Sequence, residues 1–224
     1  CSAAGVIRES QELLEKGDKL YASLHGIDGL LHDHLYDCTD MNEMQLLRLR
    51  NTPSMAFGSC RYTVREDTEE DYDRIFATLK KYQIYYIFIN GGNGSVAAGH
   101  RLCEHLKKAG YPCCLMVIPK TVDNDIAIVD HAPGFPSAAR HTVITISELV
   151  HDMYTYDTDL IMAVEVMGRN TGYLAAAAAA AGKTGWGPDL IYVPEVVFDP
   201  EQFVNDVAQI IQKKGKGFAV VAEG

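Results

Sequence analysis

The segment from Pro119 to Asp125, PKTVDND, places a cation, a hydroxyl and two carboxylates directly after a short apolar run. Such a set could move a proton beside a phosphate. Asp123 could accept the proton of an alcohol, Asp125 could hold Mg²⁺ through water, and Lys120 could neutralise phosphate charge. A polar turn capped by its own Asp and Asn side chains explains the same residues. Both interpretations stay open at this point.

A glycine-rich segment at 90–95, NGGNGS, offers a second kind of chemistry. It follows the apolar run 85–89 and precedes a helix-like segment at 96–109. A strand, a glycine turn and a helix start, in that order, point backbone N–H groups at a phosphate. Glycine lets the backbone approach closely because it has no Cβ atom. The alternative is an ordinary tight turn.

Two further polar segments also follow apolar runs. Residues 165–172, EVMGRNTG, contain Arg169, which could bind a phosphate, and Gly168, where the backbone could approach a ligand. Glu223 follows the run 218–222 and could accept hydrogen bonds from sugar hydroxyls. The alternatives are a helix start with a solvated arginine and an exposed carboxylate.

The hydrophobic pattern predicts the elements that would position these segments. Nearly continuous apolar runs, typical of strands covered on both faces, occur at 85–90, 114–119, 160–167, 190–194 and 218–222. Three amphipathic helices are predicted between or before these strands. Their apolar stripes consist of Tyr72, Ile75, Phe76 and Leu79, of Val143, Ile146, Val150 and Met153, and of Phe203, Val207, Ile210 and Ile211. The first helix starts with the acidic residues Asp67, Glu69, Glu70 and Asp71, and the third ends at Lys213-Lys214-Gly215. This alternation predicts an α/β fold with mostly parallel sheets, in which ligands bind beyond the carboxyl ends of the strands.

Two other motifs are interpreted as structural. Gly182-Lys183-Thr184 resembles the end of a phosphate-binding P-loop, but Ala177 stands where that loop begins with glycine. The triplet also follows a predicted helix, whose C-terminal end repels phosphate, so Gly182 is predicted as the cap of that helix. His32 and His34 have no second cluster of ligands nearby in sequence, and we interpret them as part of a polar loop.

Composition limits the classes of function. The net charge of −10 argues against a nucleic-acid or anionic-membrane surface, and no apolar run approaches the roughly 20 residues of a membrane helix. Six cysteines without a C-x-x-C pair predict free thiols in a reducing compartment, and hence a cytoplasmic protein. A lipid anchor on Cys1 is the alternative, which the motifs disfavour.

Taken together and in this order, the polar segments resemble the ATP- and pyrophosphate-dependent 6-phosphofructokinase family, over about Met55–Gly224. The resemblance implies Mg²⁺-dependent phosphoryl transfer from a donor to the 1-hydroxyl of fructose 6-phosphate, with Asp123 as general base. It also implies the remaining roles. Arg61, in Gly58-Ser59-Cys60-Arg61, would act between the two phosphate-bearing substrates and Lys120 on phosphate charge; Gly91, Gly92, Gly94 and Ser95 would wrap the donor; Asp125 and Asn93 would lie near the metal; Thr121, Met167, Gly168, Arg169 and Glu223 would line the sugar-phosphate site.

The sequence departs from the family pattern at several positions. Asn93 stands where many members have Asp, and it is a weaker Mg²⁺ ligand. Leu160 replaces an Arg that reaches across a subunit interface in short bacterial members. Gly94 leaves room for the α-phosphate of a nucleotide, whereas Lys120 is typical of pyrophosphate users. We expect ATP, because the absence of a clash at Gly94 is a precondition for a nucleotide, and keep pyrophosphate as the alternative.

The resemblance implies two Rossmann-like lobes with the active site in the cleft between them. Residues 1–134 would bind the phosphoryl donor and residues 135–224 the sugar phosphate, with the break near 132–136. The family's first glycine-rich loop and its C-terminal part are missing from the sequence, so we expect the second lobe to be incomplete. A homo-oligomer is expected. A non-catalytic regulatory member that binds nucleotide or sugar phosphate is the alternative to an enzyme.

Overall fold

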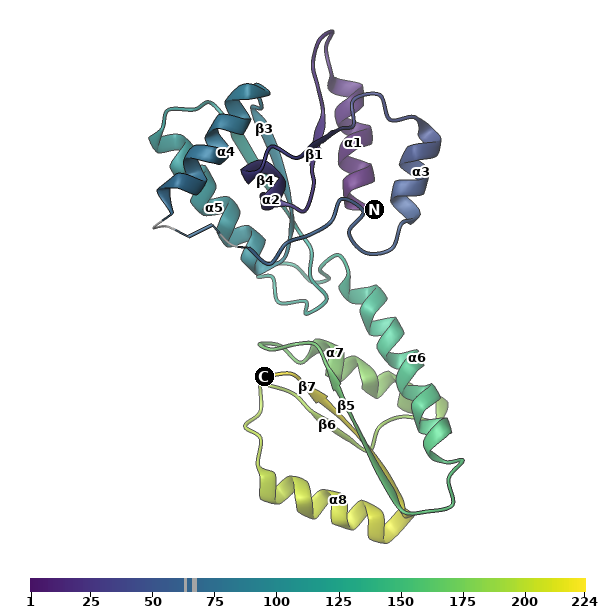
Figure 1. Ribbon diagram of the computed structural model, residues 1–224. Helices are drawn as coiled ribbons and strands as arrows, with labels where there is room; N and C mark the ends of the chain where they lie inside the picture. Colours follow the sequence, from purple (N-terminus) through teal and green to yellow (C-terminus); the bar gives the residue numbers. More distant parts are fainter. Residues whose placement is uncertain (63, 66–67) are drawn as a thin grey trace. The chain divides into compact units, whose positions relative to one another are not determined.

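The computed structural model describes residues 1–62, 64–65 and 68–224 (Figure 1). The chain divides into two compact units, Cys1–Pro119 and Lys120–Gly224. The sequence analysis placed the division between residues 134 and 135. The segment from Lys120 to Gly134 belongs to the second unit, and one contact that joins it there is the hydroxyl of Thr171, which donates to the carbonyl of Asp123 over 2.7 Å. The ligand roles assigned to the two parts stay predictions.

The first unit is built around a parallel pair of strands, β3 (Tyr86–Gly91) and β4 (Cys114–Pro119). The connecting helix α5 (Asn93–Lys108) and the preceding helix α4 (Glu69–Lys81) cover this pair on one face (Figure 1). The core between these elements includes Tyr72, Ile75, Leu79, Leu102 and Leu106. The helical stripe predicted from the sequence thus forms the buried face of α4. Asp67, one of the acidic residues expected before it, lies outside the described residues.

The opposite face of β3 and β4 is exposed in the described chain, so the expectation that these strands are covered on both faces is wrong. The cross-strand pairs Tyr86–Cys114 and Phe88–Met116 point outward, and Tyr86 exposes 74% of its surface. Alternate residues of a strand face opposite sides, and α4 and α5 cover only one of them.

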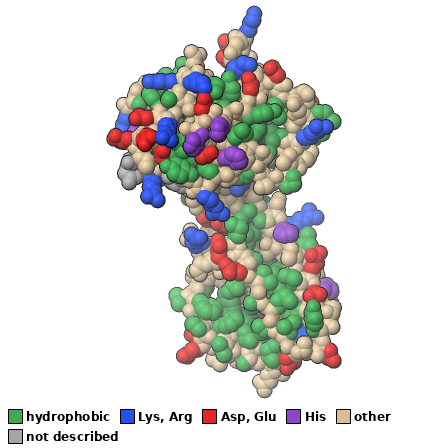
Figure 2. Space-filling model, viewed as in Figure 1, with side chains coloured by type: hydrophobic (Ala, Val, Ile, Leu, Met, Phe, Trp, Pro, Cys, Tyr) green, Lys and Arg blue, Asp and Glu red, His purple; other side chains and the backbone are tan. Residues whose placement is uncertain are grey.

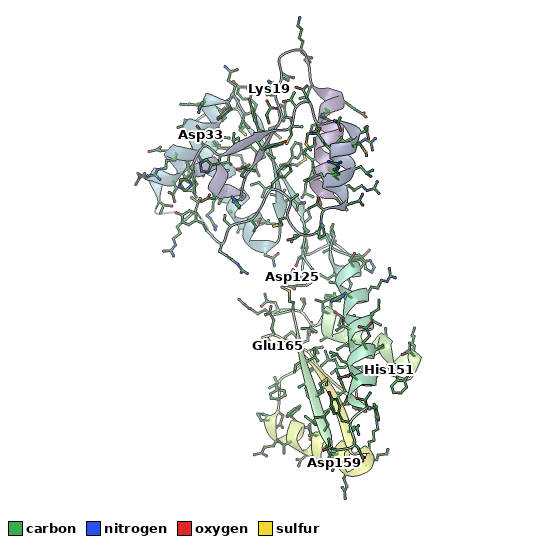
Figure 3. All side chains as sticks on the ribbon, turned by 45° about the vertical axis from the view of Figure 1, so that its right-hand side comes forward. Lys19, Asp33, Asp125, His151, Asp159 and Glu165 are labelled. Atoms are coloured by element: carbon green, nitrogen blue, oxygen red, sulfur yellow. The ribbon has the colours of Figure 1, made fainter. Side chains whose placement is uncertain are left out.

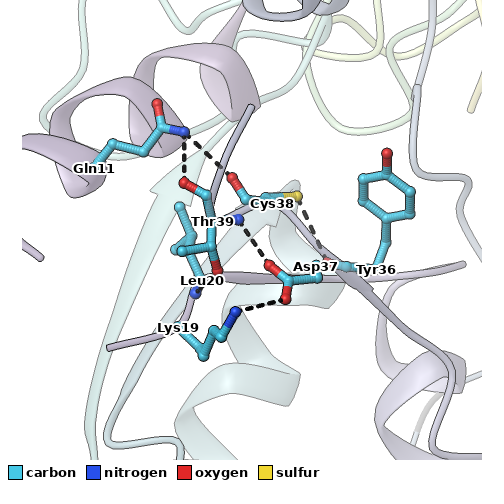
Figure 4. Close-up of polar contacts among 7 residues, drawn as sticks. All are labelled: Gln11, Lys19, Leu20, Tyr36, Asp37, Cys38 and Thr39. Atoms are coloured by element: carbon cyan, nitrogen blue, oxygen red, sulfur yellow. Dashed lines mark hydrogen bonds and ion pairs between the residues drawn. The ribbon is translucent and has the colours of Figure 1, made fainter. Parts of the chain in front are cut away.

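The N-terminal region forms a small layer of helices and a strand pair. It consists of α1 (Ser2–Leu13), a hairpin of β1 (Tyr21–Ser23) and β2 (Leu35–Asp37) around α2 (Ile27–Leu31), and α3 (Glu43–Asn51). Gln11 ties α1 to the end of the hairpin by donating to the carbonyl of Thr39 over 2.9 Å, and Lys19 pairs with Asp37 over 3.3 Å (Figure 4).

The second unit is a parallel sheet of three strands in the order β5 (Leu160–Val166), β7 (Lys216–Ala222), β6 (Leu190–Tyr192). The crossover from β5 to β6 contains α7 (Tyr173–Ala177) and a 3₁₀ helix (Ala178–Thr184), and α8 (Pro200–Lys214) returns the chain to β7. These crossovers run in opposite directions across the sheet, so right-handed connections place α7 and α8 on opposite faces (Figure 1).

The core of this unit lies between the sheet and α6 (Phe135–Met153). Phe218 and Val220 of the central strand are 1% and 0% exposed and pack with Ile146 and Val150. Hydrophobic side chains remain visible over much of the second unit on the face drawn in Figure 2. Among the described helices, none combines the length and apolarity that a bilayer span requires.

Most predicted strand ends are confirmed, whereas two predicted helix ends are wrong. The five predicted strands are present within two residues of their expected bounds. Gly215, with φ of 71°, caps α8 as expected. Gly182 was predicted as a helix cap but lies within the 3₁₀ helix, and the cap is Gly185, with φ of 84°. The last turns tighten into 3₁₀ geometry and carry the helix past Gly182.

Candidate active site

The predicted site residues divide between the two units. Arg61, Gly91, Gly92, Asn93, Gly94 and Ser95 belong to the first unit, and Lys120, Thr121, Asp123, Asp125, Met167, Gly168, Arg169 and Glu223 belong to the second. Within the second unit, Glu165 lies near the carboxyl end of β5 and Asp159 just before its other end (Figure 3). The loops after β5 and β7 therefore leave the sheet at the same end as Glu165.

The loop at 120–125 holds the main chain of Asp123 in place. The N–H of Asp123 donates to Oγ1 of Thr121 over 3.1 Å. Thr121 itself is buried and bridged to Gly134 at the start of α6. Asp123 therefore follows a short, closed turn, in agreement with the turn interpretation of this segment. The turn and the chemistry proposed for Asp123 are compatible, because the side chain takes no part in closing the turn.

Asn124 stabilises the same loop and was not singled out from the sequence. It is 6% exposed and has φ of 58°, a left-handed conformation that Asn tolerates better than most residues. Its side-chain oxygen accepts the N–H of Ala132 over 2.7 Å, and its amide donates to the carbonyl of Asp130 over 3.1 Å. An Asn between two Asp residues was the available signal, but it does not reveal which of the three is buried.

The loop after β5 is shaped by close backbone approaches. Gly168 has φ of 132°, and a Cβ atom there would collide with the carbonyl oxygen of Thr171. The hydroxyl of Thr171 donates to the carbonyl of Asp123 over 2.7 Å, which joins this loop to the 120–125 loop. Met167 and Arg169 are exposed, as ligand-binding side chains at a strand end must be.

The end of the chain returns to the same place. The N–H of Glu223 donates to the carbonyl of Val166 over 2.9 Å, which extends the pairing of β7 with β5. A Cβ atom on Gly224 would collide with the carbonyl of Arg169. The second unit thus brings together Asp123, Arg169 and Glu223, although the sequence analysis had assigned Asp123 to residues 1–134.

The electrostatics of this cluster act on one carboxylate. Burial, and then the negative charges of Asp125 and Glu223, raise the pKa of Asp123, while Arg169 opposes them. Oδ1 of Asp123 is buried and makes no hydrogen bond to any described residue. A carboxylate with a raised pKa and an uncommitted oxygen suits proton abstraction, because strong donors would otherwise stabilise its charge.

In the first unit, the glycine turn starts a helix earlier than predicted. The sequence analysis began the helix at Val96, whereas α5 begins at Asn93, so Gly94 and Ser95 lie in its first turn. The carbonyl of Gly92 accepts the N–H groups of Ser95 and Val96 over 2.9 and 3.1 Å. The N-terminal end of the 16-residue helix α5, which carries a positive partial charge, therefore lies at this turn.

Gly91 and Gly58, both in segments singled out from the sequence, lie in close contacts. A Cβ atom on Gly91 would collide with the side chain of Ser95, and one on Gly58 would collide with the ring of His25. In contrast, a Cβ on Gly94 would meet nothing within 4 Å. Arg61, three residues after Gly58, is exposed. Space is therefore open in front of Gly94, as a ligand requires.

The described residues contain no group of three or more His, Cys, Asp or Glu side chains placed to hold a metal ion. Mg²⁺ does not need such a cage, since it is commonly held by one or two carboxylates together with substrate phosphates and water. Asp125 offers a hard oxygen ligand, and its charge acts on Asp123. The residues present therefore fit Mg²⁺ brought in with a phosphorylated substrate.

Parallel α/β units with glycine turns and charged loops at the carboxyl ends of their strands are typical of Rossmann-like proteins that bind phosphate-containing ligands. The phosphofructokinase family model matches residues 4–224 of this chain. The chain belongs to the phosphofructokinase family.

Similar proteins carry names with both phosphoryl donors. The chain is 36% identical to the pyrophosphate–fructose 6-phosphate 1-phosphotransferase of Methylococcus capsulatus, over 100% of this chain and 54% of that protein. It is 31% identical to the ATP-dependent 6-phosphofructokinase of Haemophilus ducreyi, over 97% of this chain and 61% of that protein. A crystal structure of the pyrophosphate-dependent phosphofructokinase of Nitrosospira multiformis matches with a TM-score of 0.88 and 34% identity, over 100% of this chain and 56% of that one. The chain thus spans about half the length of the curated relatives it matches.

Proposed function

We propose that the protein transfers a phosphoryl group to the 1-hydroxyl of fructose 6-phosphate, with Asp123 as the general base. The buried, uncommitted Oδ1 of Asp123 is the observation that carries this proposal. Its raised pKa brings the carboxylate closer to the pH at which it must exchange a proton. Asp123 accepts the hydroxyl proton as the sugar oxygen attacks the terminal phosphorus of the donor, whose bond to its leaving oxygen breaks.

The second unit binds the sugar phosphate in this proposal. Arg169 is exposed and pairs with the 6-phosphate, for which the planar guanidinium is well suited. Glu223 accepts hydrogen bonds from sugar hydroxyls, and the backbone at Gly168 contacts the substrate. Thr121 and Met167 complete the pocket. Positioning and charge neutralisation account for most of the rate enhancement in this class of reaction.

The first unit binds the phosphoryl donor. The start of α5 directs backbone N–H groups and the positive end of the helix dipole toward the donor phosphates. Arg61, in the same unit, adds positive charge for the transferred group, and Asn93 at the start of α5 offers a weak oxygen ligand for Mg²⁺. In the second unit, Asp125 would hold Mg²⁺ and Lys120 adds positive charge for phosphate. When bound, Mg²⁺ neutralises charge on the phosphates.

Two donors remain candidates, and a different observation supports each. The open space at Gly94 supports ATP, which we place first, because the nucleotide needs room that a bulkier residue would fill. Lys120 and the names of relatives at 36% identity support pyrophosphate. Either donor leaves the role of Asp123 unchanged.

The experiment is fructose 1,6-bisphosphate formation by the full-length protein, with fructose 6-phosphate and either ATP or pyrophosphate as substrates. We expect product with ATP, and we expect Gly94→Asp to weaken use of ATP more than use of pyrophosphate. Equal loss of both donors would show that Gly94 does not select between them. Absence of product with both donors, in a protein that still binds sugar phosphate or nucleotide, would favour a regulatory member.

Two further properties belong to the proposal. A homo-oligomer is expected, as light scattering of the full-length protein can test. A cytoplasmic location agrees with the family and with the six cysteines, which are all unbridged in the structure.

A further inference from the structure

Hydrogen bonds fix the main chain of Asp123, whereas Oδ1 of its side chain accepts none from the described residues. Its N–H donates to Thr121, and its carbonyl accepts the hydroxyl of Thr171 over 2.7 Å. The next residue, Asn124, is fixed by two hydrogen bonds to the chain at 130–132. By contrast, Oδ1 of Asp123 has no hydrogen-bond partner among the described residues.

A general base benefits from main-chain hydrogen bonds that hold it and from a side chain without strong hydrogen-bond donors. Hydrogen bonds donated to the carboxylate would orient it, but they would also stabilise its charge and weaken it as a proton acceptor. Orientation by the backbone avoids that conflict. A group held to within a fraction of an ångström contributes to rate, whereas a shift of about 1 Å can cost roughly 10²-fold.

Of these hydrogen bonds, the one from Thr171 comes from the loop after β5, and the others lie within residues 121–132. Thr171 lies 48 residues from Asp123 in the sequence. Its own loop is fixed on one side, where the Thr171 carbonyl fills the space beside Gly168. It is fixed on the other side, where the N–H of Gly172 donates to Oε1 of Glu195 over 2.8 Å. The hydroxyl therefore reaches Asp123 from a loop held at both ends.

We propose that Thr171 is a positioning residue, whose hydroxyl fixes the main chain of Asp123 so that its carboxylate points at the substrate hydroxyl. The inference rests on the proposed function. Thr171 touches no reacting atom in this account, and it acts through the carbonyl of Asp123. The same hydroxyl couples the loop that carries Arg169 to the loop that carries the base.

The test compares variants of the full-length protein. Thr171→Val removes the hydroxyl and keeps the shape, and Thr171→Ser keeps the hydroxyl. Thr184→Val is the matched control, because Thr184 also donates from a partly buried hydroxyl to a carbonyl, that of Ala181, over 2.7 Å. Three readouts are needed: kcat, KM for fructose 6-phosphate, and the hydrogen-exchange rate of the main-chain N–H of Asp123, followed by NMR without substrates.

We expect Thr171→Val to lower kcat by about 10²-fold, with a much smaller change in KM. The main-chain N–H of Asp123 should exchange faster than in the wild type, because the loop loses the hydrogen bond that holds the Asp123 carbonyl. Thr171→Ser and Thr184→Val should resemble the wild type in all three readouts. If Thr171→Val does not fold, Thr171→Ala removes the same hydroxyl without placing a methyl group beside the carbonyl.

The inference is overturned if Thr171→Val keeps the wild-type kcat and exchange rate, or if Thr171→Ser loses as much as Thr171→Val. Failure of the proposed function looks different, since the wild type itself would then form no product. The exchange of the Asp123 N–H still decides the inference in that case. Faster exchange in Thr171→Val supports it, and unchanged exchange overturns it.

Discussion

Replacement of Asp123 by Asn should make the protein more stable and nearly inactive. In the folded chain, the carboxylate of Asp123 is partly desolvated and faces the negative charges of Asp125 and Glu223, with Arg169 as the opposing charge. In the unfolded chain it ionises like any exposed Asp, near pH 3.9. The folded protein therefore carries the ionised Asp123 at a cost, and Asn has the same shape without the charge.

The sign of the pH dependence follows from linkage. Because folding raises the pKa of Asp123, its favourable contribution to stability is complete below the unfolded pKa and is lost as pH rises through the folded pKa. As pH rises through the folded pKa the charge appears, so the advantage of Asn grows with pH. In acid, where Asp123 is protonated in both states, the advantage should disappear.

The magnitudes for the two effects differ. Loss of a general base costs about 10²–10⁴-fold in rate, or about 2.7–5.4 kcal/mol of transition-state stabilisation at 1.36 kcal/mol per tenfold. Relief of an unfavourable group at a functional site typically adds about 0.5–2 kcal/mol. For a chain of this size that corresponds to a rise in Tm of roughly 2–4 °C per kcal/mol.

The assay pairs kcat with calorimetric Tm at neutral and at acidic pH. Asp157→Asn is the control, because Asp157 is exposed and removal of its charge should change neither quantity. A less stable Asp123→Asn protein at neutral pH would refute the reasoning, and so would a gain in Tm that persists unchanged in acid. Normal kcat in Asp123→Asn would refute its role as base.

Two other changes test the same cluster. Glu223→Gln removes a charge that raises the pKa of Asp123, so the acidic limb of the kcat–pH profile should move to lower pH, and an unmoved limb would mean that the two carboxylates are uncoupled. Gly168→Ala combines a left-handed φ of 132° with a collision against Thr171, so it should destabilise the protein by about 1–3 kcal/mol in urea unfolding. A neutral effect would mean that this loop has room to adjust.

The sequence predicted β3 to β7 and the segments that follow them, because these depend on near neighbours. Apolar runs such as 160–167 and 218–222 are strongly patterned, and parallel strands bring their carboxyl ends to one edge. That reasoning put Asp123, Arg169 and Glu223 at strand ends, but it assigned Asp123 to residues 1–134, whereas the structure puts all three in the second unit. It was less successful at helix ends, as Gly182 shows, since tightening of the final turns has no clear local signal.

Other features required the folded chain. The exposure of Tyr86 and Phe88 could not be predicted, because their run of apolar residues looks like that of a strand buried on both faces. Asn124 and Thr171 were part of quoted motifs, yet nothing local distinguishes a side chain that closes a loop from one that meets water. Their roles emerge only from their partners at Ala132 and Asp123.

By itself, the sequence determined which residue types stand at each strand end and hence which chemistry is available, since those depend on composition and spacing over a few residues. The tertiary structure decided which of those residues is buried, which lies close to like charges, and which is held in place by hydrogen bonds to its main chain. Asp123 acquires its raised pKa from Asp125, Glu223 and burial, and its fixed backbone from a hydroxyl 48 residues away. Such long-range fields and contacts exist only once the chain has folded.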